Sequence, residues 1–473
     1  MRTSQAEVAP IPGEGYEGAV LELTVGAVAH GGHCVARDGG RVVFVRHALP
    51  GETVRAVVTE ERKGFLRADA IEVLVPSPHR VVPPCPFAGP DRCGGCDFQH
   101  ADLEYQRSLK TDVLREQLIR MGGLDPTEVT ALRVTVQGLP SVSGEPDGQG
   151  WRTRVQYTVD STGRAGLLKH RSHEVVPIDR CLIAHPAVRD SDVLGTQWHD
   201  LDAVEVVAGS AGEPVVLGRK GRGAATRVAG PGRVRERGVG RDWLLPAQAF
   251  WQVHPAAADT LAATVAELLQ PRAGDRVWDL YGGVGLFAAV LAQSAASQRG
   301  TSEERTDRAG RDIAQSGASQ RGTSEERTDR AGRDTAPATD TTGRITVVEG
   351  SPVVAAAARE NLRDLTTVTV VHADVARALA NSRWRAVDLV VLDPPRAGAG
   401  RDVVAAIAAR SPRAVAYVAC DPAALARDVQ AFREHGYGLT ELRAFDMFPH
   451  THHFECVALL TPGTLRRRPH SPG

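Results

Sequence analysis

With 473 residues, the chain is longer than one hydrophobic core usually organises, so two to four domains are expected. Its 42% apolar and 24% charged residues are ordinary for a globular protein, and no run approaches the roughly 18 apolar residues of a membrane span, which excludes membrane-spanning classes. The net charge of -1 lacks the basic excess that is common in nucleic-acid-binding proteins, so such a partner has to be argued from motifs.

The N-terminus and the cysteines bear on the cellular compartment. Residues 1–18 carry three glutamates and lack an apolar stretch, so they do not resemble a secretory signal. The seven cysteines are an odd number, and three of them (Cys85, Cys93 and Cys96) are crowded while the other four are scattered. This pattern suits metal binding or catalysis better than a disulfide framework. We therefore expect a cytoplasmic protein with reduced thiols.

The first predicted unit is a small β-barrel. Between Gly18 and Val75, short β-branched runs alternate with turns around Gly31-Gly32 and Pro50-Gly51. Residues 1–75 hold 8 Lys and Arg against 10 Asp and Glu, so their charge does not favour RNA over other roles of a β module.

A helix and a basic β segment follow. Residues 103–121 have helical spacing and end at Gly122-Gly123, and residues 138–150 are predicted as a loop. Residues 152–179 return to strand-like patterning with many basic groups: Arg152, Arg154, Arg164, Lys169, Arg171 and His173. This is the most RNA-like surface of the chain, although a solvated strand face is the commoner reason for such a pattern.

From Leu261 onward, alanine-rich helical segments alternate with apolar runs, which indicates a largely parallel α/β sheet. One stretch breaks the pattern, because residues 296–312 recur identically at 318–334. The repeated unit has no apolar face that neighbouring repeats would bury in a solenoid. Residues 293–342 are therefore predicted as a disordered surface loop.

A nucleotide-type ligand site is predicted at the carboxyl ends of these strands. The motif DLYGGVG at 279–285 lies between a strand and a helix, where glycines let a ligand approach the backbone. Glu349 ends the next strand, where a carboxylate accepts hydrogen bonds from ribose hydroxyls, and Asp374 and Asp393 end the third and fourth strands. A single aspartate at the end of a strand usually caps a loop or a helix. The glycine motif, Glu349, Asp374 and Asp393 together favour a ligand-binding site. A dinucleotide remains an alternative ligand at this point.

Two residues suit covalent chemistry beside this site. Cys420 ends the apolar run AVAYVAC, which places its thiol at the rim of the sheet, although an isolated cysteine is usually a small buried apolar residue. Glu455 in HTHHFEC is the candidate proton acceptor, with His450, His452 and His453 as competitors. The spacing of the histidines matches no recognised zinc site.

Five motifs, in this order, make the chain resemble the uridine C5 RNA methyltransferase family, in particular the branch with a TRAM domain and an iron-sulfur cluster. They are PAQAFWQVHP at 246–255, DLYGGVG at 279–285, DPPRAG at 393–398, ACDPAALARD at 419–428 and DMFPHTHHFECVALL at 446–460. The resemblance covers nearly everything from Gly18 to Pro462 except the repeat. Chance similarity does not explain motifs in this order and spacing.

The resemblance implies an α/β class I methyltransferase with a Rossmann-like, mostly parallel sheet, joined to an N-terminal OB-like barrel (TRAM) and a central β-rich RNA-binding domain. The implied boundaries are 12–75 for the barrel, 80–245 for the central domain and 246–462 for the S-adenosylmethionine-dependent methyltransferase domain. The target uridine would have to leave its stack to reach the pocket.

The resemblance also assigns roles to individual residues. It implies that Cys420 is the nucleophile that adds to carbon 6, that Glu455 is the base, and that five residues bind S-adenosylmethionine: Gln252, Tyr281, Glu349, Asp374 (near the adenine) and Asp393. Two departures from the family pattern affect fine positioning: Ala419 and Asp421 flank the nucleophile where the family usually has Ser and Asn, and Gly282 stands where cysteine is common.

The four cysteines Cys85, Cys93, Cys96 and Cys181 match the family's ligands for a [4Fe-4S] cluster, whereas spacing alone admits zinc equally. Such a cluster would pin the loop 84–98 onto the RNA-facing domain.

The expected partner is RNA, and the resemblance is greatest to enzymes that act on ribosomal RNA. No association with a membrane is expected, and the protein is expected to be a monomer. Transfer RNA as the substrate, cytosine C5 methylation and a non-catalytic RNA-binding iron-sulfur protein remain alternatives.

Overall fold

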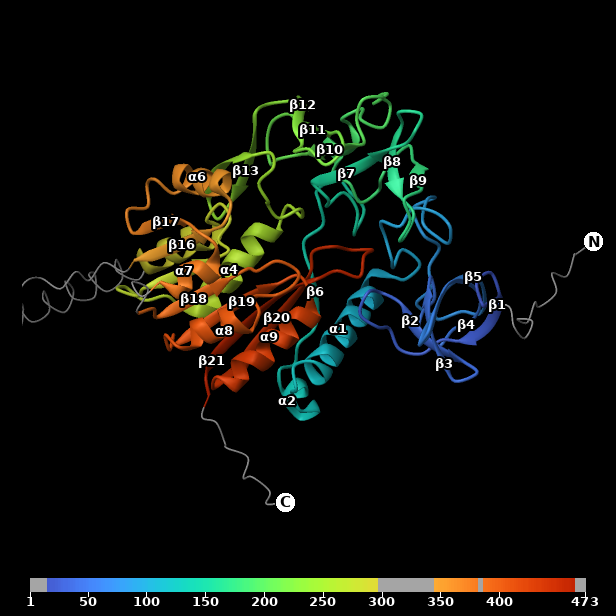
Figure 1. Cartoon of the computed structure of the whole chain (residues 1–473), viewed down its shortest axis with the longest axis horizontal. Coiled ribbons are helices and arrows are strands. Elements are labelled where there is room, and N and C mark those ends of the chain that lie inside the picture. Colours follow the sequence, from blue (N-terminus) through green and yellow to red (C-terminus); the bar gives the residue numbers. More distant parts are fainter. Residues whose placement is uncertain (1–14, 297–343, 382–385, 464–473) are drawn as a thin grey trace, which may run out of the picture.

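The computed structural model describes residues 15–296, 344–381 and 386–463. It consists of an N-terminal barrel, a central β domain and a C-terminal α/β domain (Figure 1). The predicted repeat loop lies outside the described residues, except that residues 293–296 continue the helix that begins at residue 286. None of the described helices is long and apolar enough to cross a membrane.

The N-terminal barrel has five strands in the order β1-β4-β5-β3-β2. They are β1 (Val20–Thr24), β2 (Cys34–Asp38), β3 (Arg41–Arg46), β4 (Thr53–Arg62) and β5 (Phe65–Val75). Alternate residues of these strands, such as Val54, Ala56 and Val58, are buried in one shared core. This period of two is the reason the sequence pattern predicted a β unit.

The C-terminal domain is a doubly wound sheet in the order β17-β16-β15-β18-β19-β21-β20-β6. Its strands are β15 (Val277–Leu280), β16 (Ile345–Glu349), β17 (Val368–His372), β18 (Leu389–Leu392), β19 (Ala414–Ala419), β20 (Tyr437–Asp446), β21 (Glu455–Pro462) and β6 (Val136–Gly138). The first five in this order pair in parallel, and β21 is antiparallel to both neighbours. The predicted Rossmann-like sheet is therefore present.

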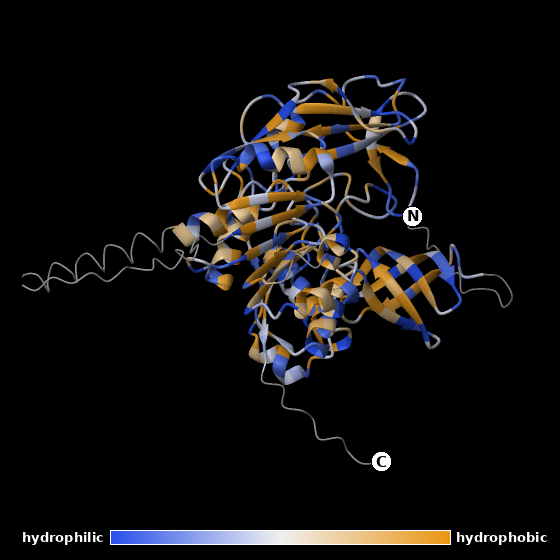
Figure 2. Ribbon diagram, turned by 60° about the vertical axis from the view of Figure 1, so that its left-hand side comes forward, coloured by the Kyte–Doolittle hydropathy of each residue, from blue (hydrophilic) through white to orange (hydrophobic). Residues whose placement is uncertain are grey.

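Helices cover both faces of this sheet: α4 (Ala257–Leu269), α6 (Pro352–Asn361), α7 (Val375–Ala380), α8 (Arg401–Ala408) and α9 (Pro422–Glu434). Alternate strand residues enter two different cores, so that Val390 and Leu392 pack on one face while Leu389 and Val391 pack on the other. Since both faces are buried at the centre of the sheet, β18 and β19 consist of apolar residues, and much of the sheet is orange in Figure 2.

The boundary predicted between the central and C-terminal domains is wrong for residues 103–138. α1 (Leu103–Arg120) packs against α9, α2 (Pro126–Ala131) packs against α1, and β6 extends the large sheet beside the end of β20 (Figure 1). The paired residues Val136 and Ala444 are about 300 positions apart. Local patterning predicted the helix, but it carries no information about such a distant partner.

The central domain is built on a six-stranded sheet in the order β12-β11-β10-β7-β8-β9. Its elements are β7 (Arg154–Val159), β8 (Ala165–Leu168), β9 (Val175–Pro177), α3 (Pro186–Arg189), β10 (Ala203–Val207), β11 (Val215–Arg219) and β12 (Thr226–Ala229). A hairpin of β13 (Arg233–Gly238) and β14 (Arg241–Pro246) leads back to the C-terminal domain, where Arg241 pairs with Asp364 at 2.6 Å.

Candidate active site

A cavity of ≈ 730 Å³ lies between the carboxyl ends of the large sheet and the central domain. We call it the main cavity. It brings together six of the seven residues predicted to bind the donor or to catalyse: Gln252, Tyr281, Glu349, Asp393, Cys420 and Glu455. Parallel strands end at the same edge of a sheet, which is why residues from separate motifs meet here.

At one end of the main cavity, the turn formed by the glycines of the DLYGGVG motif contacts Glu349. The carboxylate of Glu349 accepts hydrogen bonds from the backbone N–H of Gly283 (3.1 Å) and of Ser351 (2.6 Å). Gly285 has φ +91°, and a Cβ added there would lie 2.3 Å from Leu362, so only glycine fits. A Cβ at Gly282 would lie 2.6 Å from Val347 Cγ1, which explains the glycine at the position where the family often has cysteine.

Two aspartates add to the negative character of this end. Burial raises the pKa of Asp393 to about 7, and burial together with the charges of Asp393 and Glu349 raises the pKa of Asp279 to about 7. Asp279 accepts a hydrogen bond from Ala288 N (2.9 Å) through one carboxylate oxygen, while the other oxygen is buried without a partner. Sequence reasoning did not single out Asp279, although its position directly before the glycine turn was a usable signal.

Asp374 lies apart from the other predicted donor residues. It is exposed, and its side chain caps α7 by accepting a hydrogen bond from Arg377 N at 3.0 Å. It is absent from the lining of the main cavity, although its charge contributes to raising the pKa of Tyr281. A role near the adenine therefore stays a prediction.

Cys420 and Glu455 lie opposite each other at the ends of the adjacent strands β19 and β21. The register of β19 and β21 pairs Ala419 with Cys456, so the next pair along the two strands is Cys420 and Glu455. Burial, followed by the charges of Glu455 and Asp393, raises the pKa of Cys420 to about 12. Burial and the charge of Asp393 also raise the pKa of Glu455 well above its ordinary value. Without ligands, both groups therefore favour their protonated forms.

Arg396 is a lining residue that sequence reasoning passed over. It follows the two prolines of the DPPRAG motif, is exposed, and lines the main cavity. Its charge acts to lower the pKa of both Cys420 and Glu455, against the effect of burial. It is a cation placed beside the two reacting groups, and it belongs to the same motif as Asp393.

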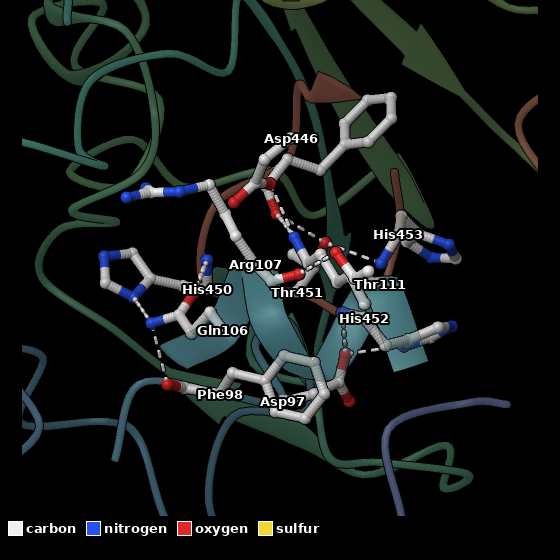
Figure 3. A network of polar contacts seen from close by, with 12 residues as sticks. Asp97, Phe98, Gln106, Arg107, Thr111, Asp446, His450, Thr451, His452 and His453 are labelled. Carbon is white, nitrogen blue, oxygen red and sulfur yellow. Dashed lines mark hydrogen bonds and ion pairs between the residues drawn. The ribbon is translucent and has the colours of Figure 1, made fainter. Parts of the chain in front are cut away.

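The histidine loop at 448–453 is held by α1 and by the loop 84–98 that carries Cys85, Cys93 and Cys96, which we call the cysteine loop (Figure 3). Gln106 accepts a hydrogen bond from His450 N (2.8 Å) and contacts the ring of His450 at 3.2 Å, while the backbone N–H groups of Asp97 and Phe98 donate to His450 O. The buried Lys110 pairs with Asp446 at 2.5 Å. α1 thus fixes the segment that leads into Glu455.

The three histidines of this loop have different surroundings. His452 and His453 line the main cavity, and His452 Nδ1 lies 2.7 Å from Asp97 Oδ2, whereas His450 is buried against Gln106. Burial lowers the pKa of His450 to about 4 and, aided by the charge of His452, lowers that of His453 to about 3. Unlike His452 and His453, His450 does not line the main cavity.

The cysteine loop lies against β8, where Gly94 N donates to Leu168 O at 2.9 Å. Burial raises the pKa of Cys93 to about 11 and that of Cys96 further, and both pKa values also respond to the charge of Cys181. Gly95 N donates to the sulfur of Cys93 (3.4 Å), and Gln99 Nε2 donates to the sulfur of Cys96 (3.3 Å). In the described part of the chain, no group of three or more His, Cys, Asp or Glu side chains is spaced to hold a metal ion.

The basic residues of the segment 152–179 line two different cavities. Arg152 and Arg154 line the main cavity, while Lys169 and Arg171 line a neighbouring one. Phe250 also lines the main cavity, with 62% of its surface exposed. An exposed phenylalanine among arginines is the combination that holds unstacked nucleotides.

Comparisons with known proteins agree with this geometry. The TRAM domain family matches residues 14–71, and the tRNA (Uracil-5-)-methyltransferase family matches residues 379–462. An uncharacterized RNA methyltransferase of Streptomyces avermitilis is 43% identical, over 94% of this chain and 99% of the relative. The 23S rRNA (uracil(1939)-C(5))-methyltransferase of Chromohalobacter salexigens is 31% identical, over 94% and 90%.

Among solved structures, the tRNA (uracil-54, C5)-methyltransferase of Pyrococcus abyssi in complex with S-adenosyl-L-homocysteine aligns with a TM-score of 0.63. At 21% identity, it covers 93% of this chain and 99% of its own. At this identity the likeness shows the fold, which is that of a class I methyltransferase. Full-length relatives, two matching family models and the residues gathered in the main cavity lead to one conclusion: the chain belongs to the S-adenosylmethionine-dependent RNA (uracil-5-)-methyltransferase family.

Proposed function

We propose that this protein methylates carbon 5 of a uridine in ribosomal RNA through a covalent adduct between Cys420 and carbon 6. The observation that carries the proposal is the placement of Cys420 opposite Glu455 in the cavity that also holds the predicted donor residues. Carbon 5 of uracil is a weak nucleophile until a thiolate adds to carbon 6, so the reaction needs a cysteine and a base on one site.

The donor end of the main cavity has the chemistry of a site for a cationic nucleoside. Glu349 is placed to accept hydrogen bonds from ribose hydroxyls, and Asp279 and Asp393 have raised pKa values because their charges are buried without a cation. A bound ligand with a positive sulfonium centre would stabilise the ionised carboxylates and lower these pKa values. The open space at Gly283, where an added Cβ would meet nothing within 4 Å, leaves room for it beside the backbone.

The proposed reaction uses Cys420 as the nucleophile and Glu455 as the base. The Cys420 thiol gives its proton to water, and the thiolate adds to carbon 6, which moves the electron pair of the 5,6 double bond into an enolate. Carbon 5 then attacks the methyl group of the donor, which leaves as S-adenosylhomocysteine. Glu455, ionised in the complex where Arg396 and the cationic donor lower its pKa, removes the proton from carbon 5, the double bond reforms, and Cys420 is expelled as the thiolate.

The raised pKa of Cys420 requires activation when substrates bind. At about 12, this pKa keeps the free thiol protonated, whereas the attacking species is the thiolate. Two cations oppose the effect of burial: Arg396, which already lowers the pKa of Cys420, and the positive donor next to Asp393. Cys420 is therefore expected to become nucleophilic only in the complex, which protects it from oxidation in the free protein.

At the RNA end, Arg152 and Arg154 supply charge for phosphates, and Phe250 supplies an exposed ring for an unstacked base. Ribosomal RNA is preferred as the substrate because a relative aligned over nearly the whole chain is named for 23S rRNA. Transfer RNA is the second candidate, since the protein that shares the fold and the family matched at residues 379–462 are named for tRNA.

We also propose that Cys85, Cys93, Cys96 and Cys181 hold a [4Fe-4S] cluster, which requires their side chains to come closer together, because among the described residues they are not spaced to hold a metal ion. N–H groups donate to two of the sulfurs, as they do to cluster thiolates, and the charge of Cys181 contributes to raising the pKa of both Cys93 and Cys96. When bound, the cluster would tie the loop to the central domain. Iron and acid-labile sulfide in the purified protein, both lost in Cys181→Ser, would support this assignment, whereas stoichiometric zinc would contradict it.

The test of function is incubation of the protein with labelled S-adenosylmethionine and unmodified ribosomal or transfer RNA, followed by nucleoside analysis. Labelled 5-methyluridine that is lost in Cys420→Ala and retained in Cys34→Ala supports the proposal. Cys34 is a matched control because it is buried in the barrel core, away from the main cavity. Label in 5-methylcytidine, or full activity of Cys420→Ala, would contradict the proposal.

A further inference from the structure

The loop at residues 393–400, which we call the proline loop, connects β18 to α8 and carries two residues that line the main cavity, Asp393 and Arg396. Both charges act on the nucleophile. Burial raises the pKa of Cys420, the charge of Asp393 adds to this effect, and the charge of Arg396 opposes it. The chemistry at Cys420 therefore depends on where the proline loop lies relative to the elements that flank the nucleophile.

A buried carboxylate holds the last residues of the proline loop. Asp428 is 5% exposed, and its Oδ2 atom accepts hydrogen bonds from Ala399 N at 2.7 Å and from the Tyr417 hydroxyl at 2.6 Å. Gly400 N lies 3.3 Å from each oxygen of this carboxylate, and Ala399 N lies 3.1 Å from the Tyr417 hydroxyl. Two consecutive backbone N–H groups of the loop therefore converge on one anchor.

The proline loop lies so close to α9 that its backbone requires glycine. Gly398 has φ +90°, and a Cβ added there would lie 2.7 Å from Oδ2 of Asp428 and 3.4 Å from Ala424 Cβ. Gly400 is the N-cap of α8 but has no side chain that could accept a hydrogen bond. The carboxylate of Asp428 lies at this N-terminus instead, where the helix dipole favours a negative charge. The contact between the loop and α9 is thus specified by the residues on both sides.

Tyr417 and Asp428 lie on either side of the nucleophile in the chain, but neither lines the main cavity. Tyr417 is in β19, which ends just before Cys420, and Asp428 is in α9, which follows it. Burial, and then the charges of Asp374 and Asp428, raise the pKa of the lining residue Tyr281 to about 12. The carboxylate of Asp428 therefore lies directly behind the site, where it connects the elements that carry Cys420 to the proline loop.

We propose that Tyr417 and Asp428 are positioning residues for methyl transfer. They hold the proline loop against α9 and thereby keep its Arg396 beside Cys420. The inference rests on the proposed function, in which Cys420 needs a neighbouring cation to become a thiolate. Residues of this kind contribute to the rate without contacting the substrate, because a displacement of about 1 Å at the reacting groups costs up to about 10²-fold.

The decisive comparison is Tyr417→Phe against Tyr437→Phe in the full-length protein. Both hydroxyls are on buried side chains and donate one hydrogen bond, that of Tyr417 to Asp428 and that of Tyr437 to the carbonyl of Pro412, which precedes β19. Neither substitution changes a charge, and assays well below both unfolding midpoints remove differences in stability. We expect Tyr417→Phe to lower kcat about tenfold with little change in KM for RNA, and Tyr437→Phe to keep the kcat of the wild type. Asp428→Asn, which also weakens both backbone contacts, should lower kcat further.

A measurement without turnover separates positioning from a general loss of stability. The alkylation of Cys420 by iodoacetamide is followed on its peptide by mass spectrometry, at neutral pH and with S-adenosylmethionine present. The rate reports the thiolate fraction, so Tyr417→Phe should react several-fold more slowly than the wild type, because a displaced Arg396 no longer opposes the effect of burial. Tyr437→Phe should react like the wild type.

Action through Arg396 is tested by combining Tyr417→Phe with Arg396→Ala. If Tyr417 acts by holding Arg396, its hydroxyl should have little further effect on alkylation or kcat in the Arg396→Ala protein. Independent effects of the two changes would overturn the positioning role and leave the proposed function intact. The same holds if Tyr417→Phe and Tyr437→Phe behave alike while the wild type methylates uridine. A wild type that does not methylate RNA would overturn the proposed function and this role with it.

Discussion

The Nε2 atom of His30 lies 3.1 Å from Oδ2 of Asp421, the residue directly after Cys420. His30 belongs to the loop between β1 and β2, so this ion pair joins the barrel to the rim of the active site. Asp421 also accepts a hydrogen bond from Ala424 N at 2.7 Å and thereby caps α9, which begins at Pro422. The residue that departs from the family pattern therefore has two partners, one in its own helix and one in the barrel.

These two partners can be separated by mutation. Asp421→Asn keeps a good helix cap but removes the charge, whereas Asp421→Ala removes both, so Asp421→Ala should be less stable than Asp421→Asn by about 1 kcal/mol. His30→Ala should leave stability within about 1 kcal/mol of the wild type, because the pair is partly exposed, and should weaken catalysis through kcat/KM for RNA. Urea unfolding and steady-state kinetics measure both effects. Identical stability of the two Asp421 variants would show that the cap contributes nothing.

The role of Glu455 as the base predicts a trapped intermediate. Glu455→Gln retains the shape of the side chain but cannot accept the proton from carbon 5, so methyl transfer should occur once while product release falls about 10²–10⁴-fold. A covalent protein–RNA complex should accumulate and resist denaturing electrophoresis. It should disappear in Cys420→Ala/Glu455→Gln. A Glu455→Gln enzyme that turns over normally would assign the base to another group.

The buried carboxylates predict a dependence of stability on pH. The pKa of Asp279 is raised from 3.8 to about 7 on folding, so the folded protein holds the proton more tightly than the unfolded chain. The free energy of unfolding contributed by this group is therefore fully present below pH ~4 and is lost as the pH rises towards ~7. Asp279→Asn should flatten this profile by an amount on the order of 1 kcal/mol or more.

Urea unfolding of wild type and Asp279→Asn at pH 5 and pH 8 checks this expectation. Since the charged carboxylates favour a cationic ligand, donor affinity should rise over the same pH range in the wild type and less in the variant. Parallel stability profiles for the two proteins would mean that Asp279 is already ionised in the folded state at low pH.

The buried pair of Lys110 and Asp446 predicts a strong effect of single substitutions. Each residue is 1% exposed and the charged atoms are 2.5 Å apart, so Lys110→Met leaves an unpaired buried carboxylate and should cost about 3–5 kcal/mol. Lys110→Met/Asp446→Leu removes both charges and should recover much of that loss. Thermal unfolding of the three variants measures the coupling. If the stability losses of the two single variants simply added up in the double variant, the two charges would not interact.

Much of the fold follows from local pattern. The period of two in β4 and the fully apolar strands β18 and β19 reflect burial on one or on both faces, which any sequence of these elements has to encode. Residues at strand ends, such as Glu349, Asp393 and Cys420, were predictable as site residues because parallel strands share one edge.

What local pattern leaves open depends on contacts between distant residues. The side chains of Lys110 and Asp446, 336 positions apart, help attach α1 to the C-terminal domain, and this contradicted the predicted boundary. Asp374 also ends a strand, but β17 is the edge strand of the sheet, and the residue caps α7 instead of lining the main cavity.

The sequence by itself determined the family, the classes of element and most of the residues in the main cavity, because these depend on motifs and on hydrophobic periodicity. Only the tertiary structure decided which surfaces meet: Cys420 opposite Glu455, His30 on Asp421, and Arg46 of the barrel 3.8 Å from Asp97. The physical reason is that burial and pairing of charges depend on neighbours in space, and the neighbours of these residues come from other domains or other strands.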